Sequence, residues 1–267
     1  MRTLFLLGLA LGAWALAQPE KRAVVIEGSN LVRIGGVGSF SVSQEAEGIV
    51  GVIEDTVIRS NRFVFIPAPG QAFEEGKRVV RVGKISAADA AVFQPALVSV
   101  APAVRQRLEP LVAQLDPATA QGVRVEREDL EVTGSLLVIV EESGEGTILG
   151  PLEAQAASGQ GAQPLILRSE SSSGQLLFDL DTDLVVIEGG AGFDDNGASG
   201  RADEIAYDQK LGVAVLRCLG AEPCRATDSG GNEVVAAEIE YSTRSGNLRA
   251  RQRERPRQLV ELRLSLN

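Results

Sequence analysis

A sequence motif that recurs three times in the second half of the chain limits the folds that the chain can adopt. In its clearest copy, an apolar run ends in Tyr207 and Asp208, and Gly212 precedes a second apolar run. Aromatic residues at 178, 207 and 241 mark the three copies. A repeat of this size is typical of one supersecondary unit stacked on its neighbours. Each copy has the pattern of a hairpin of two short strands, so the sequence predicts a stack of hairpins.

The turn of each hairpin follows from its residue types. Asp208 starts the turn, because its side chain accepts hydrogen bonds from the amides that follow. Gly212 supplies a positive φ where the loop joins the returning strand. The second copy keeps Tyr241 and Gly246. The third copy has Asp183 in place of the glycine, and aspartate tolerates left-handed backbone better than most residues.

Short β-like runs separated by Gly, Ser, Asn and Asp fill most of the remaining chain. Their spacing favours an all-β sandwich, barrel or roll over βαβ units. We therefore expect an N-terminal β region over 18–100 and a second β region over 122–267. The stretch 153–164, rich in Ala, Gln and Gly, has the composition of a loop or linker.

One segment has helical periodicity instead. Between Pro102 and Asp116 the apolar residues are spaced by three or four positions, which places them on one helix face. Pro117 then ends the pattern. The sequence predicts a short helical insertion over 101–121. The residues of the apolar face are Val104, Leu108, Leu111 and Leu115.

The first residues have the features of a secretory signal peptide. Arg2 precedes an apolar run over 4–17, which ends in Ala15, Leu16 and Ala17 before Gln18. The run is too short for a membrane-spanning helix of about 20 residues. We therefore expect a signal peptide at 1–17 and a periplasmic mature chain without a transmembrane segment.

The composition argues against most enzyme classes. The chain has no histidine, which excludes Ser-His-Asp and Cys-His nucleophiles and removes the usual ligands of hydrolytic zinc. No P-loop or nucleophile elbow is present. A glycosidase needs only two carboxylates, but the few aromatic residues argue against sugar stacking. A formal net charge of −10 argues against nucleic-acid binding. We expect no enzyme activity, no cofactor and no metal.

Two features leave alternatives open. Asp179, Asp181 and Asp183 alternate, which on a strand would give either a Ca²⁺ site or a solvated face near a turn, and the solvated face is favoured. The only cysteines, Cys218 and Cys224, flank a turn. In an exported chain they are expected to form a disulfide rather than remain two unpaired thiols.

The repeat also has a specific family resemblance. The pattern Ala-x-x-Ile-x-Tyr-Asp-x4-Gly-x3-Leu resembles the OstA-like domain of lipopolysaccharide transport proteins of the LptA type, over about 165–255. The first copy carries it with Ala202, Ile205, Tyr207, Asp208, Gly212 and Leu216. The second carries it with Ala236, Ile239, Tyr241, Gly246 and Ala250.

The resemblance implies a fold and a function. The fold is an all-β OstA-like β roll (a β-taco or jelly roll) of stacked hairpins, open along one side, with an apolar groove for lipid chains. The function is to hold or pass an amphipathic envelope lipid, lipopolysaccharide-like, toward the outer membrane. The alternative is that the inward residues simply pack a closed β sandwich. The candidate groove residues are Ile205, Tyr207, Val213, Val215, Ile239, Tyr241 and Leu248.

Arginines alternate after the second copy. Arg249, Arg251 and Arg253 would share one strand face, with Arg255 and Arg257 beyond them. Arginine suits bidentate phosphate recognition, so these are candidates for binding an anionic headgroup or an acidic partner. The alternative is a solvated edge. A second function class is also open: a structural or assembly scaffold of the cell envelope, acting through protein contacts or self-association at edge strands.

Overall fold

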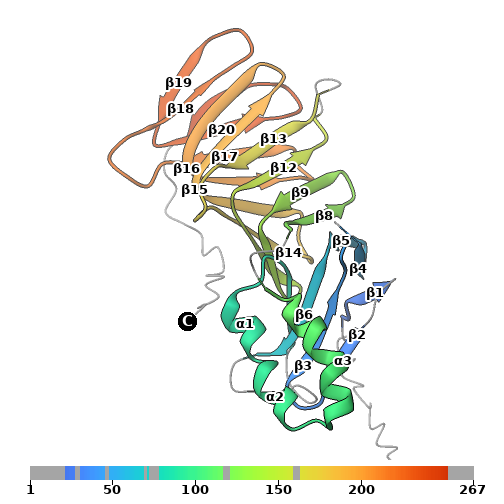
Figure 1. Ribbon diagram of the computed structural model, residues 1–267. Coiled ribbons are helices and arrows are strands. Elements are labelled where there is room, and N and C mark those ends of the chain that lie inside the picture. Colours follow the sequence, from blue (N-terminus) through green and yellow to red (C-terminus); the bar gives the residue numbers. More distant parts are fainter. Residues whose placement is uncertain are drawn as a thin grey trace, which may run out of the picture.

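A computed structural model describes residues 22–27, 31–45, 48–68, 71, 78–116, 121–158 and 163–251. The expected signal peptide at 1–17 and the candidate Arg253 lie outside these residues. The described chain forms a 21-stranded antiparallel sheet and three helices (Figure 1). The all-β fold class expected from the sequence is confirmed.

The sheet is folded over into two layers, which we call layer A and layer B. Layer A contains, in spatial order, β1 (Val25–Glu27), β4 (Ile49–Ile53), β5 (Thr56–Ser60), β8 (Val123–Arg127), β9 (Leu130–Gly134), β12 (Leu152–Ala156), β13 (Leu165–Ser169), part of β15 (Leu184–Asp195), part of β16 (Ala198–Asp208), β18 (Cys224–Thr227) and β19 (Glu233–Ala236).

Layer B has the same organisation. It contains β2 (Leu31–Ile34), β3 (Gly38–Val42), β6 (Arg62–Pro67), β7 (Arg78–Gly83), β10 (Leu136–Val140), β11 (Glu145–Leu149), β14 (Gln175–Asp179), the other parts of β15 and β16, β17 (Val213–Arg217), β20 (Glu238–Ser242) and β21 (Leu248–Arg251). The chain thus travels once along the roll, from β1 and β2 at one end to β19 and β21 at the other (Figure 1).

Two long strands make the layers one sheet. The first part of β15 pairs with β14 in layer B, and its last part pairs with β13 in layer A. The register shifts between Glu188 and Ala191, where Gly189 and Gly190 have φ of 86° and 82°. A β-bulge of this kind bends a strand. The N-terminal β region belongs to the same roll, because β5 pairs with β8 and β7 with β10.

The two long sides of the roll differ. On one side, which we call the spine, the chain passes between the layers, and backbone hydrogen bonds join successive passages: Lys84 to Ser135 at 2.8 Å, and Gly150 to Gly174 at 2.7 Å. On the other side, which we call the mouth, hairpin turns from both layers end. Layer A contributes turns 54–55, 128–129, 196–197 and 228–232, and layer B contributes 141–144, 180–183, 209–212 and 243–247.

The repeated motif corresponds to three hairpins of layer B, β14–β15, β16–β17 and β20–β21. Gly212 and Gly246 have φ of 66° and 68°, as the turns require. Asp208 Oδ1 accepts a hydrogen bond from the Leu211 amide at 2.8 Å. The third copy differs. Asp183 stands in the position of the glycine, but it does not have the positive φ that we expected there.

Two assignments made from the sequence are wrong. β14 ends at Asp179 and β15 begins at Leu184, so Asp181 and Asp183 lie in a turn and the three aspartates do not share a strand face. Asp179 Oδ1 instead accepts a hydrogen bond from the Asp181 amide at 2.9 Å. The described residues contain no group of three or more acidic, Cys or His side chains placed to hold a metal ion. The expected linker over 153–164 begins later, since β12 extends to Ala156.

The helical insertion is α1 (Ala87–Ala91), α2 (Gln94–Val98) and α3 (Pro102–Ala113), of which the sequence indicated only α3. The first two are too short to show a helical period. All three pack against the outer face of layer B (Figure 1). Phe40 of β3 meets Phe93 edge to face, with ring centroids 5.0 Å apart. This second core is separate from the core between the layers.

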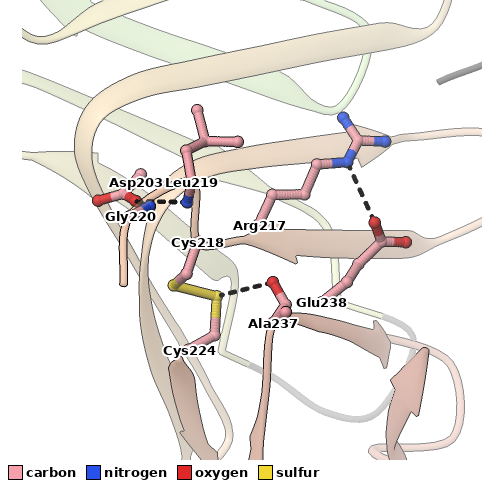
Figure 2. The surroundings of a disulfide bond; sticks show 8 residues. All are labelled: Asp203, Arg217, Cys218, Leu219, Gly220, Cys224, Ala237 and Glu238. Atoms are coloured by element: carbon pink, nitrogen blue, oxygen red, sulfur yellow. Dashed lines mark hydrogen bonds and ion pairs between the residues drawn. A yellow bond between two sulfur atoms is a disulfide. The ribbon is translucent and has the colours of Figure 1, made fainter. Parts of the chain in front are cut away.

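A disulfide joins the layers at the spine (Figure 2). Cys218 follows β17 of layer B and Cys224 begins β18 of layer A, with their Cα atoms 5.3 Å apart. Asp203, which lies between the layer A and layer B parts of β16, also holds the turn between the two cysteines. Its Oδ2 accepts hydrogen bonds from the Leu219 and Gly220 amides at 2.6 and 3.2 Å.

Replacing both Cys218 and Cys224 by serine is expected to lower the free energy of unfolding by about 2 kcal/mol, since the crosslink closes only a short loop. Urea denaturation of the oxidised wild type and the double variant measures the difference. Equal midpoints, with the wild-type disulfide verified by intact mass, would show that the bond contributes nothing to stability.

Candidate functional site

The space between the layers is the principal apolar volume of the described chain. Inward side chains from both layers form one continuous cluster that extends along the roll from β4 to β20. Strand alternation explains it, since every second residue of each strand points to the same face. Members with 0–1% exposure, taken in order along the chain, include Ile58, Phe63, Leu137, Leu167, Ile187, Phe193, Ile239 and Tyr241.

Most of the candidate groove residues lie in this interior. Ile205, Tyr207, Ile239 and Tyr241 are at most 2% exposed and belong to the cluster. Leu248 is half-buried and packs against the cluster at the end of layer B. The sequence pattern of an aromatic residue with an isoleucine two positions before it therefore identified inward positions correctly.

Val213 and Val215 were assigned to the wrong face. In β17 it is Ala214 and Leu216 that are fully buried in the interior cluster, while both valines are partly exposed. The register explains the difference, because Ala214 lies opposite Tyr207. Paired residues on antiparallel strands point to the same face, so the valines point outward. The turn length, which the sequence pattern left open, sets this register.

Aromatic rings fill much of the interior. Phe193 lies opposite Gly200 in layer A, and Phe178 lies opposite Gly146 in layer B. A Cβ atom on either glycine would overlap the neighbouring ring, so each ring lies against its own layer. Phe193 also stacks on Tyr241 of layer B, with centroids 4.7 Å apart. The two layers are thus in direct contact.

A polar pair is buried among these apolar groups. The Tyr241 hydroxyl donates a hydrogen bond to Asp195 Oδ2 at 2.9 Å, and Asp195 is only 2% exposed. Asn196 Nδ2 donates to Asp195 Oδ1 at 2.7 Å. Burial, and the adjacent Asp195 carboxylate, raise the pKa of Tyr241. Burial likewise raises the pKa of Tyr207. No local signal in the sequence indicates this pair, because Tyr241 and Asp195 lie 46 residues apart in the chain.

A small cleft opens into the interior from the mouth. Its volume is about 30 Å³, roughly the share of one water molecule in the liquid. Its floor is apolar, formed by Ile148, Leu176 and Phe178, while Arg127 and Gln209 lie at its polar rim. The interior is therefore packed with buried side chains, and the cleft is a point of access to it.

Two arginines cross the mouth beside this cleft. Arg22 Nε lies 2.6 Å from Glu54 Oε1 of layer A. The same guanidinium donates to the Ser143 carbonyl at 2.7 Å and pairs with Asp181, both in turns of layer B. The Asp181 carboxylate raises the pKa of Arg22. Arg127 of β8 donates to the carbonyl oxygens of Leu180 and Thr182 in layer B at 2.9 and 3.1 Å.

The arginine row lies on the outer face of β21 rather than in the interior. Arg249 and Arg251 are exposed and lie opposite Glu240 and Glu238 of β20. Arg251 Nε is 3.5 Å from Glu240 Oε2 and 3.7 Å from Glu238 Oε1. The strand face that carries Arg251 is therefore partly neutralised by acidic neighbours within the same layer.

Comparison with known proteins does not assign this chain to a family. Neither the family models nor the curated proteins include a match to this chain. Among the described residues, no helix has the length and apolar character needed to cross a membrane. The functional argument therefore depends on the architecture, on the interior and mouth, and on the sequence pattern of the hairpins.

Proposed function

We propose that the protein binds an amphipathic envelope lipid in the periplasm, with an acyl chain between the two layers and the headgroup in water at the mouth. The act is binding and transfer toward the outer membrane, without bond making. One observation carries the proposal: a single folded-over sheet encloses a continuous apolar interior along its whole length and has its access cleft on one long side.

The energetics favour an acyl chain as the ligand. Burying ten methylenes gains about 8 kcal/mol, at about 0.8 kcal/mol for each. Part of that gain is offset, because the rings that fill the interior must move aside. Phe178 is suited to such movement, since it is only partly buried and forms part of the cleft floor.

The family resemblance supports the same proposal. The positions that carry the OstA-like pattern in the first hairpin include Ile205, Tyr207 and Leu216, and all three point into the interior. An OstA-like protein holds lipid chains in such an interior. The signal peptide expected at 1–17 would deliver this chain to the compartment where envelope lipids are transferred.

A second candidate function is a scaffold for envelope assembly. The packed interior favours it, because the access cleft has a volume of only about 30 Å³. The roll also has free edges at both ends: among the described residues, β1, β2, β19 and β21 each pair with a single strand. Such edges can pair with another chain or with a second copy.

Native mass spectrometry of the protein purified from its source separates the two candidates. We expect a population whose mass is higher by one lipid, and release of that lipid under collisional activation, because the apolar interior shields the acyl chain. A lipid-free mass under gentle conditions, together with a stable protein partner or oligomer, would contradict lipid binding and support the scaffold.

A further inference from the structure

We infer that the mouth between the β8–β9 turn and the β14–β15 turn is a gate, held closed by Arg22 and Arg127, and that an acyl chain enters at the cleft beside Arg127. The identity of the ligand depends on the function proposed above. The closure itself depends only on contacts between the two layers.

Arg22 binds three turns at once through hydrogen bonds and ion pairs. Glu54 belongs to the β4–β5 turn of layer A, whereas Ser143 and Asp181 belong to separate turns of layer B. The arginine side chain is only 16% exposed, although it lies on the rim. Hydrogen bonds to charged partners are stronger than neutral ones, so this one residue opposes separation of the layers.

The backbone next to Arg22 also joins the two layers at the mouth. The Val24 amide donates a hydrogen bond to Glu141 Oε1 of layer B at 2.9 Å, immediately before β1 joins layer A. Glu141 is 3% exposed and is also held by Arg78 Nη2 at 2.8 Å. Residues 22–24 therefore cross the mouth as a strap.

Arg127 closes the mouth directly at the cleft. It ends β8 in layer A, and its two terminal nitrogens donate to two carbonyl oxygens of the 180–183 turn in layer B. Its Nε lies 3.4 Å from Asp55 of its own layer, which orients the guanidinium. A planar guanidinium can hold two acceptors in this way, whereas the single ammonium of lysine cannot hold both equally.

The roll is built to open at this side and not at the other. The spine is joined by the chain itself, by backbone hydrogen bonds and by the Cys218–Cys224 disulfide. At the mouth, by contrast, the contacts described between the layers are hydrogen bonds and ion pairs, chiefly of Arg22 and Arg127. Leu176 and Phe178 line the same cleft as Arg127. Release of the two arginines would expose these apolar residues.

Spin labels on either side of the mouth test the gate without any lipid. The labels are placed on Asp129→Cys in layer A and Leu211→Cys in layer B, both exposed, in the full chain. The two native cysteines are joined in the disulfide, so only the introduced thiols react. We expect one narrow distance distribution in the wild-type background and a broader, longer one in the Arg22→Gln/Arg127→Gln double variant.

A matched control separates gating from general loss of charge. Arg225 pairs with Glu233 at 3.2 Å within layer A, so Arg225→Gln removes an arginine ion pair without touching the mouth, although this side chain is more exposed than Arg22. We expect the control to keep the wild-type distance distribution. An unchanged distribution in a folded double variant would overturn the gate. If the double variant does not fold, the same measurement is made on Arg127→Lys. An unchanged distance distribution in that variant would then overturn the gate.

A second measurement distinguishes failure of the gate from failure of the proposed function. A fluorescent fatty acid should associate with the double variant faster than with the wild type, on the order of tenfold, because hydrogen bonds to charged groups no longer oppose opening. Equal association rates would overturn the gate. A broadened distance distribution without probe binding to any of the proteins would keep the gate and overturn lipid binding.

Discussion

Replacing Phe193 by alanine is expected to lower the free energy of unfolding by about 3–5 kcal/mol. The ring is 1% exposed, stacks on Tyr241 from the opposite layer and occupies the space above Gly200. Its removal therefore leaves a cavity and also breaks a contact that joins the two layers. Urea denaturation followed by circular dichroism measures the loss.

The outer face of the roll provides the control for Phe193. Val235 of β19 is 45% exposed, so Val235→Ala is expected to change stability by no more than about 0.5 kcal/mol. A Phe193→Ala protein as stable as the Val235→Ala protein would mean that the layers are not packed on each other. The interior would then be open to solvent even without a ligand.

The second large effect concerns alkaline pH. Both tyrosines of the chain are buried between the layers, and burial raises the pKa of each above the ordinary value of 10.0. Below pH 10 the folded and unfolded states both keep the phenol protons. Above it the unfolded state releases them while the folded state keeps them. Stability therefore falls by up to about 1.4 kcal/mol per pH unit for each tyrosine.

The measurement is a spectrophotometric titration of phenolate absorbance beside a circular dichroism titration. We expect the two curves to coincide, because the tyrosines ionise only as the protein unfolds. Tyr241→Phe should reduce the slope of stability against pH above 10, although it leaves the buried Asp195 with one hydrogen-bond donor fewer. Smooth ionisation near pH 10 with unchanged circular dichroism would contradict the burial of both phenols.

Local features could be predicted from the sequence because their causes are local. The turn at Asp208 and Gly212, the inward aromatic residues and the helix over Pro102–Ala113 each depend on residues a few positions apart. Which residues of the returning strand β17 point inward could not be predicted. One residue more or less in the turn decides whether Val213 or Ala214 faces the interior.

The mouth could not be predicted, for a different reason. The partners of Arg22 lie 32, 121 and 159 residues away, and the layers that bring them together exist only in the folded roll. The alternating aspartates misled for the opposite reason. Their period matches a strand, but the strand ends at Asp179 and the following residues turn back toward β15.

Site-specific photocrosslinking tests most directly whether a lipid chain enters between the layers. A benzoylphenylalanine in place of Phe178 puts the reactive group at the floor of the cleft, and the same residue in place of Val235 puts it on the outer face. After irradiation in the cell envelope, we predict acyl-lipid adducts at position 178 and none at position 235. Lipid adducts that are absent at 178, or equally abundant at both positions, would contradict the proposed lipid-binding interior.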